Sequence, residues 1–225
     1  MPFMLDLSEI ASWRQPETNL RKLMQHLGKT QPDHEPLALT TILECNGLNY
    51  ALQCFCILPK ALNVRRLYAV WEASLVKHLM RDERSRNALI VAQRYANGNA
   101  TDNELRAAWT AAKVAAGDTA WARTKALFMG AAVPKTSAEA ADEAAASAAR
   151  AAVRASTWNS QEPLPWTTAR AVGWAAHCAA PLGDNDADAA IKAALTTMLK
   201  RVFECETMGQ AVQLLNAEID KESMK

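Results

Sequence analysis

The sequence predicts an all-α protein, on the evidence of its composition and of the spacing of its alanines. Alanine, the best helix former, accounts for 45 of the 225 residues, whereas glycine accounts for only 8. Thirty-four alanines lie between Ala100 and Ala194, many in pairs that recur every four residues, as on one face of a helix. We expect about ten antiparallel helices in one compact array. An all-β fold is excluded and a Rossmann-like fold is disfavoured.

A single domain over residues 1–225 is expected, because a chain of this length buries one sizeable core and no break in composition marks a linker. A subdivision into two parts follows the composition. A Leu-rich helical part over 1–99 is expected to pack on an Ala-rich helical part over 100–225.

The Leu-rich part begins with a predicted helix over about 5–27, where leucines recur at helical spacing, and Gly28 ends it. Residues 31–36 contain two prolines and are expected to form a loop. Short helices are predicted over 39–45 and 48–58.

From about residue 64 a helix carries an apolar stripe that includes Leu67, Val70 and Trp71. The clearest local prediction follows it, as a helix, a tight turn and a second helix. A helix over 84–97 ends at a glycine, Gly98, which readily takes the left-handed conformation of helix ends. The next helix begins at a capping box, Thr101-Asp-Asn-Glu104, in which each side chain bonds the other residue's backbone N–H.

Further helices are predicted over 137–157, 166–179, 186–203 and 207–222. Their alanine pairs form smooth stripes that let neighbouring helix axes approach to about 8 Å. Such stripes bury little area, so the core needs large anchors as well. The tryptophans placed to supply them are Trp109, Trp121, Trp158, Trp166 and Trp174.

The N-terminal residues lack the basic region and long apolar core of a signal peptide, and no run of about 20 apolar residues is present. The five cysteines form no regular framework, which favours reduced thiols. We therefore expect a cytoplasmic protein. Its 25 basic and 24 acidic side chains exclude binding to nucleic acid or membrane through the charge of its whole surface.

No metal, cofactor or catalytic site is predicted. Cys54 and Cys56 would point about 200° apart on a helix, and no Cys-x-x-Cys pair exists. His177 and Cys178 are adjacent, so their side chains diverge on a helix. No Gly-rich phosphate loop occurs, and none of the four histidines lies in a nucleophile signature. We expect a protein that is not an enzyme.

The main candidate binding region is a local excess of basic residues between Arg65 and Arg94. It contains seven basic and three acidic residues, an excess of four positive charges that suits nucleic acid or an acidic protein. The alternative is a solvated rim in which Asp82 and Glu83 pair with neighbouring arginines. The candidate contact residues here are Arg65, Arg66, Lys77, Arg81, Arg84 and Arg86.

Trp158 and Trp166 complete the candidate contact set, because they flank a Pro-containing loop over 161–165. Tryptophan is enriched among the interface residues that carry binding energy. The alternative is that both fill gaps between small side chains.

The segment Arg66-Leu-Tyr-Ala-Val-Trp71, the segment Ala92-Gln-Arg-Tyr-Ala-Asn-Gly98 and the alanine-rich helices after them carry a family resemblance. Over about 40–200 the chain resembles the alanine-rich immunity proteins of polymorphic-toxin loci and related proteins of phages and prophages. The resemblance implies an all-helical intracellular protein that acts by binding a protein partner. It implies no catalytic residue.

The expected function is therefore an immunity-like or inhibitor-like factor that masks or sequesters a toxin or defence protein. The alternative is a nucleic-acid-associated accessory protein that uses the region from Arg65 to Arg94. A third class, an unrecognised hydrolase or transferase, requires a cleft that no sequence motif locates. Closely packed alanine helices are also compatible with a homodimer.

Overall fold

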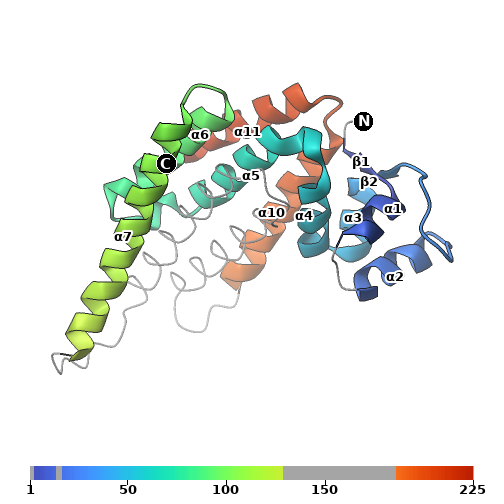
Figure 1. Cartoon of the computed structure of the whole chain (residues 1–225), viewed down its shortest axis with the longest axis horizontal. Coiled ribbons are helices and arrows are strands. Elements are labelled where there is room, and N and C mark those ends of the chain that lie inside the picture. Colours follow the sequence, from blue (N-terminus) through green and yellow to red (C-terminus); the bar gives the residue numbers. More distant parts are fainter. Residues whose placement is uncertain (1–2, 14–16, 129–185, 225) are drawn as a thin grey trace.

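Helices account for most of the structure, a computed structural model that describes residues 3–13, 17–128 and 186–224 (Figure 1). The predicted helical fold is confirmed for these residues. The helices expected over 137–157 and 166–179 lie outside them, so an array of about ten antiparallel helices stays a prediction. None of the described helices is both long enough and apolar enough to cross a membrane.

The described helices follow the chain in order, with one small sheet near the N-terminus. The α-helices are α1 (Leu7–Ser12), α2 (Glu17–His26), α3 (Leu39–Asn46), α4 (Leu48–Ile57), α5 (Leu62–Ser74), α6 (Glu83–Ala96), α7 (Asp102–Phe128), α10 (Asp186–Glu204) and α11 (Met208–Ser223). The 3-10 turns are η1 (Pro59–Ala61) and η2 (Lys77–Leu79). The antiparallel strands β1 (Met4–Leu5) and β2 (Leu37–Ala38) pair Met4 with Ala38.

The single helix predicted over 5–27 is wrong. Residues Met4 and Leu5 form β1, and α1 begins only after Asp6. The Asp6 carboxylate accepts the Glu9 N–H at 2.7 Å, and the Glu9 carboxylate accepts the Asp6 N–H at 3.0 Å. This capping box fixes the start of α1, and an extended Trp13 ends it.

The predicted turn around Gly98 is confirmed. Gly98 has a φ of +77°, and the Asn99 N–H donates to the Arg94 carbonyl at 2.7 Å. The Thr101 N–H donates to Glu104 at 2.7 Å, and the Glu104 N–H donates to the Thr101 hydroxyl at 3.3 Å. The capping box therefore starts α7, which packs along α6.

In the first two alanine pairs of α7 the second residue is buried and the first is more exposed. Ala108 and Ala112 are buried, whereas Ala107 is exposed. Leu105 and Ala115 extend the buried stripe. The narrow stripe allows the close approach to α6 that the alanine spacing predicts.

Helix α5 is the central element of the described structure. It packs against α6 and α11 and also meets α4, while α10 packs against α3 and α4. In Figure 1, α1 to α3 and the sheet form one end of the molecule, and α6 and α7 lie at the other. The arrangement places the end of α11 beside the turn between α5 and α6.

An aromatic cluster joins the N-terminal strand region to α4 and α10. The ring centroids of Phe3 and Phe55 are 6.0 Å apart, those of Phe3 and Phe203 are 5.6 Å apart, and those of Phe55 and Phe203 are 5.3 Å apart. All three side chains are buried. Tyr68 of α5 extends the cluster and donates its hydroxyl to the Leu195 carbonyl at 2.8 Å. One continuous core thus contains residues from both ends of the chain.

Candidate functional site

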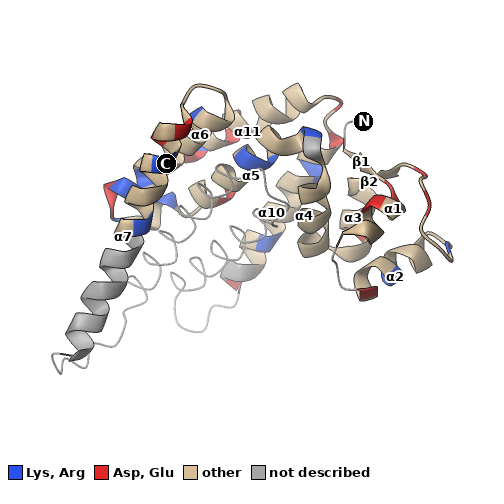
Figure 2. Ribbon diagram, viewed as in Figure 1, with Lys and Arg blue, Asp and Glu red and all other residues tan. Residues whose placement is uncertain are grey.

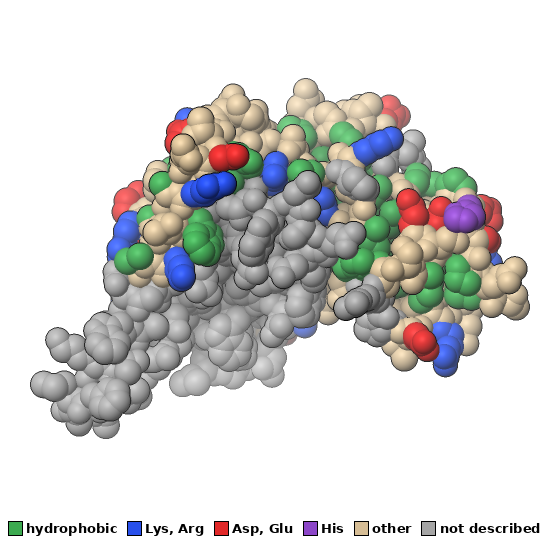
Figure 3. Space-filling view, viewed as in Figure 1, with side chains coloured by type: hydrophobic (Ala, Val, Ile, Leu, Met, Phe, Trp, Pro, Cys, Tyr) green, Lys and Arg blue, Asp and Glu red, His purple; other side chains and the backbone are tan. Residues whose placement is uncertain are grey.

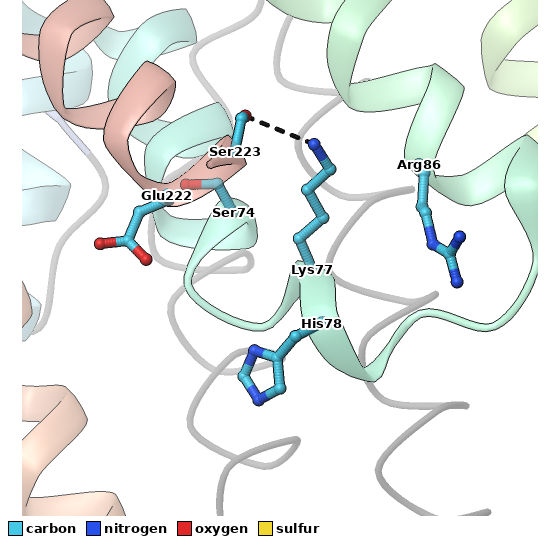
Figure 4. A pocket seen from close by; sticks show the side chains of 6 residues that line it. All are labelled: Ser74, Lys77, His78, Arg86, Glu222 and Ser223. Carbon is cyan, nitrogen blue, oxygen red and sulfur yellow. Dashed lines mark hydrogen bonds between the residues drawn. The ribbon is translucent and has the colours of Figure 1, made fainter. Parts of the chain in front are cut away.

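A cavity of about 530 Å³ opens where the turn between α5 and α6 meets the end of α11 (Figure 4). We call it the α5–α6–α11 pocket. Its volume lies in the range of small-ligand sites, about 300–1,000 Å³. The described residues that line it are Ser74, Lys77, His78, Arg86, Glu222 and Ser223.

The turn between the two helices places Lys77 and His78 side by side on η2. α5 ends at Ser74, and the Val76 N–H donates to the Ala73 carbonyl at 3.3 Å. After η2, the Met80 N–H donates to the Lys77 carbonyl at 3.0 Å. The chain is therefore held tightly on both sides of the two basic residues.

The Arg86 side chain is fixed by three neighbours. Its Nε donates to the Met80 carbonyl at 2.7 Å, and its Nη2 donates to the Arg81 carbonyl at 3.5 Å. Its Nη1 donates to Glu83 at 3.1 Å, in an ion pair whose carboxylate is largely exposed. A guanidinium has five N–H donors, so two remain beyond these three bonds. Arg86 thus presents an oriented positive charge at the pocket.

Lys77 links the turn to the end of α11. Its ammonium donates to the Ser223 hydroxyl at 3.3 Å, as the dashed line in Figure 4 shows. Two of its three N–H donors remain beyond this bond. The Ser74 hydroxyl donates to the Trp71 carbonyl at 2.7 Å, so its oxygen is left as an acceptor.

Positive charge predominates among the described residues of the pocket. Lys77 and Arg86 are cationic, and His78 contributes an imidazole beside them. Glu222 is the acidic residue among them, and its carboxylate points away from Lys77 and Arg86 in Figure 4. Two oriented cations with spare donors suit an anionic group.

Polar contacts with α6 hold α11 in place. The Asn97 and Asn216 amides bond each other in both directions, at 2.8 and 2.9 Å. Gln93 donates to Asn216 at 3.1 Å and to Asp220 at 3.2 Å. These bonds fix the last turns of the helix that closes one side of the pocket.

Of the predicted contact residues, the structure brings Lys77 and Arg86 together. Arg84 bonds Asp82 through Nη2 at 2.7 Å, and Arg86 bonds Glu83, so the solvated-rim alternative is confirmed for these two pairs. Arg81 is exposed. Trp158 and Trp166 lie outside the described residues.

Arg65 and Arg66 lie in other surroundings. Arg65 donates through Nη1 to the Cys56 carbonyl, and the Arg66 guanidinium carbon lies 4.9 Å from the centroid of the Tyr95 ring. Burial lowers the pKa of both guanidiniums. In Figures 2 and 3 the described basic residues are interspersed with acidic and neutral ones. The basic residues of the sequence cluster therefore divide among several local contacts.

Two buried polar groups near the pocket were not predicted. Glu72 is 0% exposed, and neither of its carboxyl oxygens has a hydrogen-bond partner in the described part of the chain. Ser85 is also 0% exposed, and its hydroxyl likewise has none there. Burial raises the pKa of Glu72 well above its usual value of 4.5. Glu72 lies two residues before Ser74, and Ser85 directly precedes Arg86.

A signal for Glu72 exists in the sequence, since it interrupts the apolar run from Tyr68 to Ala73. An acidic residue inside such an apolar run is expected to lie on a buried face of the helix. His78 was missed for another reason. Nothing in the local pattern places it in the same pocket as Arg86, which lies eight residues later on a different helix.

The described residues contain no group of three His, Cys, Asp or Glu side chains arranged to hold a metal ion. Four cysteines, Cys45, Cys54, Cys56 and Cys205, are free thiols. Burial raises the pKa of Cys54 to about 12, so its thiol stays protonated at neutral pH. A comparison of the chain with protein-family models, curated proteins and solved structures gave no match.

Proposed function

We propose that the chain is a non-enzymatic protein-binding factor of the immunity or inhibitor kind, which holds its partner in a fixed ratio at the α5–α6–α11 pocket. One observation carries the proposal. Lys77, His78 and Arg86 meet in one cavity of about 530 Å³, between helices that are fixed by hydrogen bonds. A rigid pocket with few charges suits the recognition of one group on a folded partner.

The partner we propose is a toxin or a defence protein of the cell, in keeping with the family resemblance of residues 40–200. In this function the chain masks the partner's active surface and performs no turnover. No cofactor is required, and the protein acts in the cytoplasm. The array of about ten antiparallel helices is the scaffold that we propose for this surface.

Binding of nucleic acid is the competing function, and the contacts of the basic residues weigh against it. Such binding needs many cations spaced along one surface, because affinity comes largely from contacts to successive phosphates. Arg84 forms an ion pair with Asp82, and Arg86 forms one with Glu83. Arg65 lies partly buried beside Cys56. Few of the candidate cations therefore remain on one accessible face.

The test is affinity purification of the tagged full-length chain from its native cells, at low and at high salt. The bound fraction is analysed for proteins by mass spectrometry and for nucleic acid by absorbance. We expect one protein, in a fixed ratio, that survives high salt and that binds again when both proteins are purified. Lys77→Glu should abolish its retention.

Lys22→Glu is the matched control, since Lys22 is exposed on α2, at the other end of the molecule in Figure 1. It makes the same charge change and should retain the partner. Recovery of nucleic acid alone, lost as salt rises, would favour the accessory-protein alternative. If Lys77→Glu retains the partner as well as the wild type does, the contact lies elsewhere on the chain.

A further inference from the structure

We infer that the α5–α6–α11 pocket is a carboxylate-recognition site, which takes the side chain of an aspartate or glutamate, or a C-terminal carboxylate, from the protein partner. The inference rests on the proposed function, because it names the chemistry by which that site would bind. Four features of the pocket support it: its charge, the orientation of its donors, its size and the buried groups beside it.

The charge of the pocket favours an anion. Lys77 and Arg86 line it as cations, and the Glu222 carboxylate is turned away from both (Figure 4). The other nearby carboxylate, Glu83, bonds Arg86 through Nη1 at 3.1 Å and is 77% exposed. Hydrogen bonds between ionised donors and acceptors are about twice as strong as neutral ones. An incoming carboxylate would therefore gain a charge-assisted bond from Lys77 or from Arg86.

The donors are also oriented before any ligand arrives. Arg86 is held by the Met80 and Arg81 carbonyls, and Lys77 is held by Ser223. A donor that is already fixed loses little side-chain entropy on binding. The planar guanidinium matches the two oxygens of a carboxylate, and the Lys77 ammonium adds a point charge.

The size of the cavity favours a side chain or chain end over an extended polyanion. A volume of about 530 Å³ admits a carboxylate together with the few atoms that carry it. A nucleic acid backbone requires a row of cations along an open groove, because its phosphates are regularly spaced. The pocket instead offers two cations, Lys77 of η2 and Arg86 of α6.

Buried polar groups at the same helix ends are an independent sign of a functional site. Glu72 and Ser85 are fully buried without hydrogen-bond partners in the described part of the chain. Such groups lower stability, and native proteins keep few of them away from functional sites. Glu72 precedes the pocket residue Ser74 by two positions, and Ser85 is next to Arg86. Burial raises the pKa of the Glu72 carboxyl and so disfavours its negatively charged form beside the pocket.

The test uses the purified full-length chain and calorimetric titration with short peptides. The first probe is a peptide with both ends blocked and a single glutamate. The second has a free C-terminal carboxylate and no acidic side chain, and its amidated form is the blank. Inorganic phosphate is the fourth probe. We expect one or both carboxylate peptides to bind more tightly than phosphate, and the amidated blank not to bind.

Lys77→Met should weaken the binding of the peptide by about tenfold or more, a loss of roughly 1.4 kcal/mol. Ser223→Ala removes the same 3.3 Å bond but keeps the ammonium, so it should weaken binding less than Lys77→Met does. Lys22→Met, on α2, should leave binding unchanged. Circular dichroism melting shows whether each variant is folded. Comparison with Ser223→Ala distinguishes the loss of the Lys77 charge from the loss of the contact between η2 and α11.

The outcomes distinguish the two proposals. If no carboxylate probe binds while the cellular partner is still retained, the carboxylate inference is overturned and the proposed function stands. If the peptides bind through Lys77 but no cellular protein is retained, the proposed function fails and the site chemistry stands. Binding that Lys77→Met leaves unchanged, or phosphate binding as tight as peptide binding, would overturn the inference.

Discussion

Asn97, at the end of α6, and Asn216, in α11, bond each other through both of their side-chain amides, at 2.8 and 2.9 Å. The two residues are 119 positions apart in the chain, and both are partly buried. Gln93 adds a bond to the same Asn216 oxygen at 3.1 Å. This network fixes the register of α11 against α6, and with it the position of Ser223 beside Lys77.

Asn216→Ala should lower the free energy of unfolding by about 1–3 kcal/mol, because it leaves partly buried amide groups on Asn97 and Gln93 without their partner. Urea denaturation followed by circular dichroism measures the change. Gln213→Ala, an exposed position on the same helix, should change stability by less than about 0.5 kcal/mol. Equal effects of the two variants would show that the network contributes nothing.

Glu72→Gln should remove a pH dependence of stability. Burial holds the pKa of Glu72 well above 4.5 in the folded protein, so the folded state keeps a proton that the unfolded chain releases. The free energy of unfolding therefore falls as pH rises from about 4.5 towards the folded pKa, with a slope of up to about 1.4 kcal/mol per pH unit. Denaturation curves measured between pH 4.5 and 8 should show this slope in the wild type and a flatter one in the variant.

The opposite sign applies to Asp82 and Glu218. Hydrogen bonds from Arg84 lower the pKa of Asp82, and a hydrogen bond from Lys221 lowers the pKa of Glu218. Both carboxylates therefore stabilise the fold at pH values above their ordinary pKa, and this stabilisation is lost in acid. Their contributions therefore change below about pH 4.5, outside the range used for Glu72. Glu206→Gln is the control, because Glu206 is exposed. A wild-type slope that survives Glu72→Gln would refute the assignment.

Phe203→Ala should lower the free energy of unfolding by about 3–5 kcal/mol, since it empties the centre of the cluster with Phe3 and Phe55. Differential scanning calorimetry should show a large drop in Tm. Ile90→Ala is the control, because Ile90 is 47% exposed on α6 and should cost less than about 1 kcal/mol. A similar Tm for both variants would mean that the cluster is not the core that links α10 to α4.

Gly98→Ala should destabilise the protein by about 1–2 kcal/mol, because Gly98 has a φ of +77°, where a Cβ is strained. Gly209→Ala should have the opposite sign. Gly209 lies in α11 without positive φ, and an added Cβ would meet the nearest atom, the Thr207 hydroxyl oxygen, at 3.8 Å. Replacing a helical glycine with alanine typically stabilises by about 0.5–1 kcal/mol. Thermal melting of the two variants compares them directly, and a shift in the same direction for both would contradict the assignment of the turn.

Most described helix ends lie within about two residues of their predicted positions, as at Gly98 and Thr101. The N-terminus differs, because leucine spacing predicted one helix over 5–27. The Asp6–Glu9 capping box is a local feature of the sequence, whereas the pairing of β1 with β2 joins segments more than 30 residues apart.

By itself, the sequence determined the helical fold and the turn at Gly98, and it offered the pairing of Asp82 and Glu83 with nearby arginines as one of two alternatives. These features depend on backbone conformation and on contacts within a few residues, which composition and spacing record directly. Tertiary structure alone decided that Lys77, Arg86 and Ser223 share a pocket and that Arg65 lies beside Cys56. The physical reason is that each of these depends on how α4, α5, α6 and α11 pack, and packing brings together residues whose separation along the chain carries no signal of their contact.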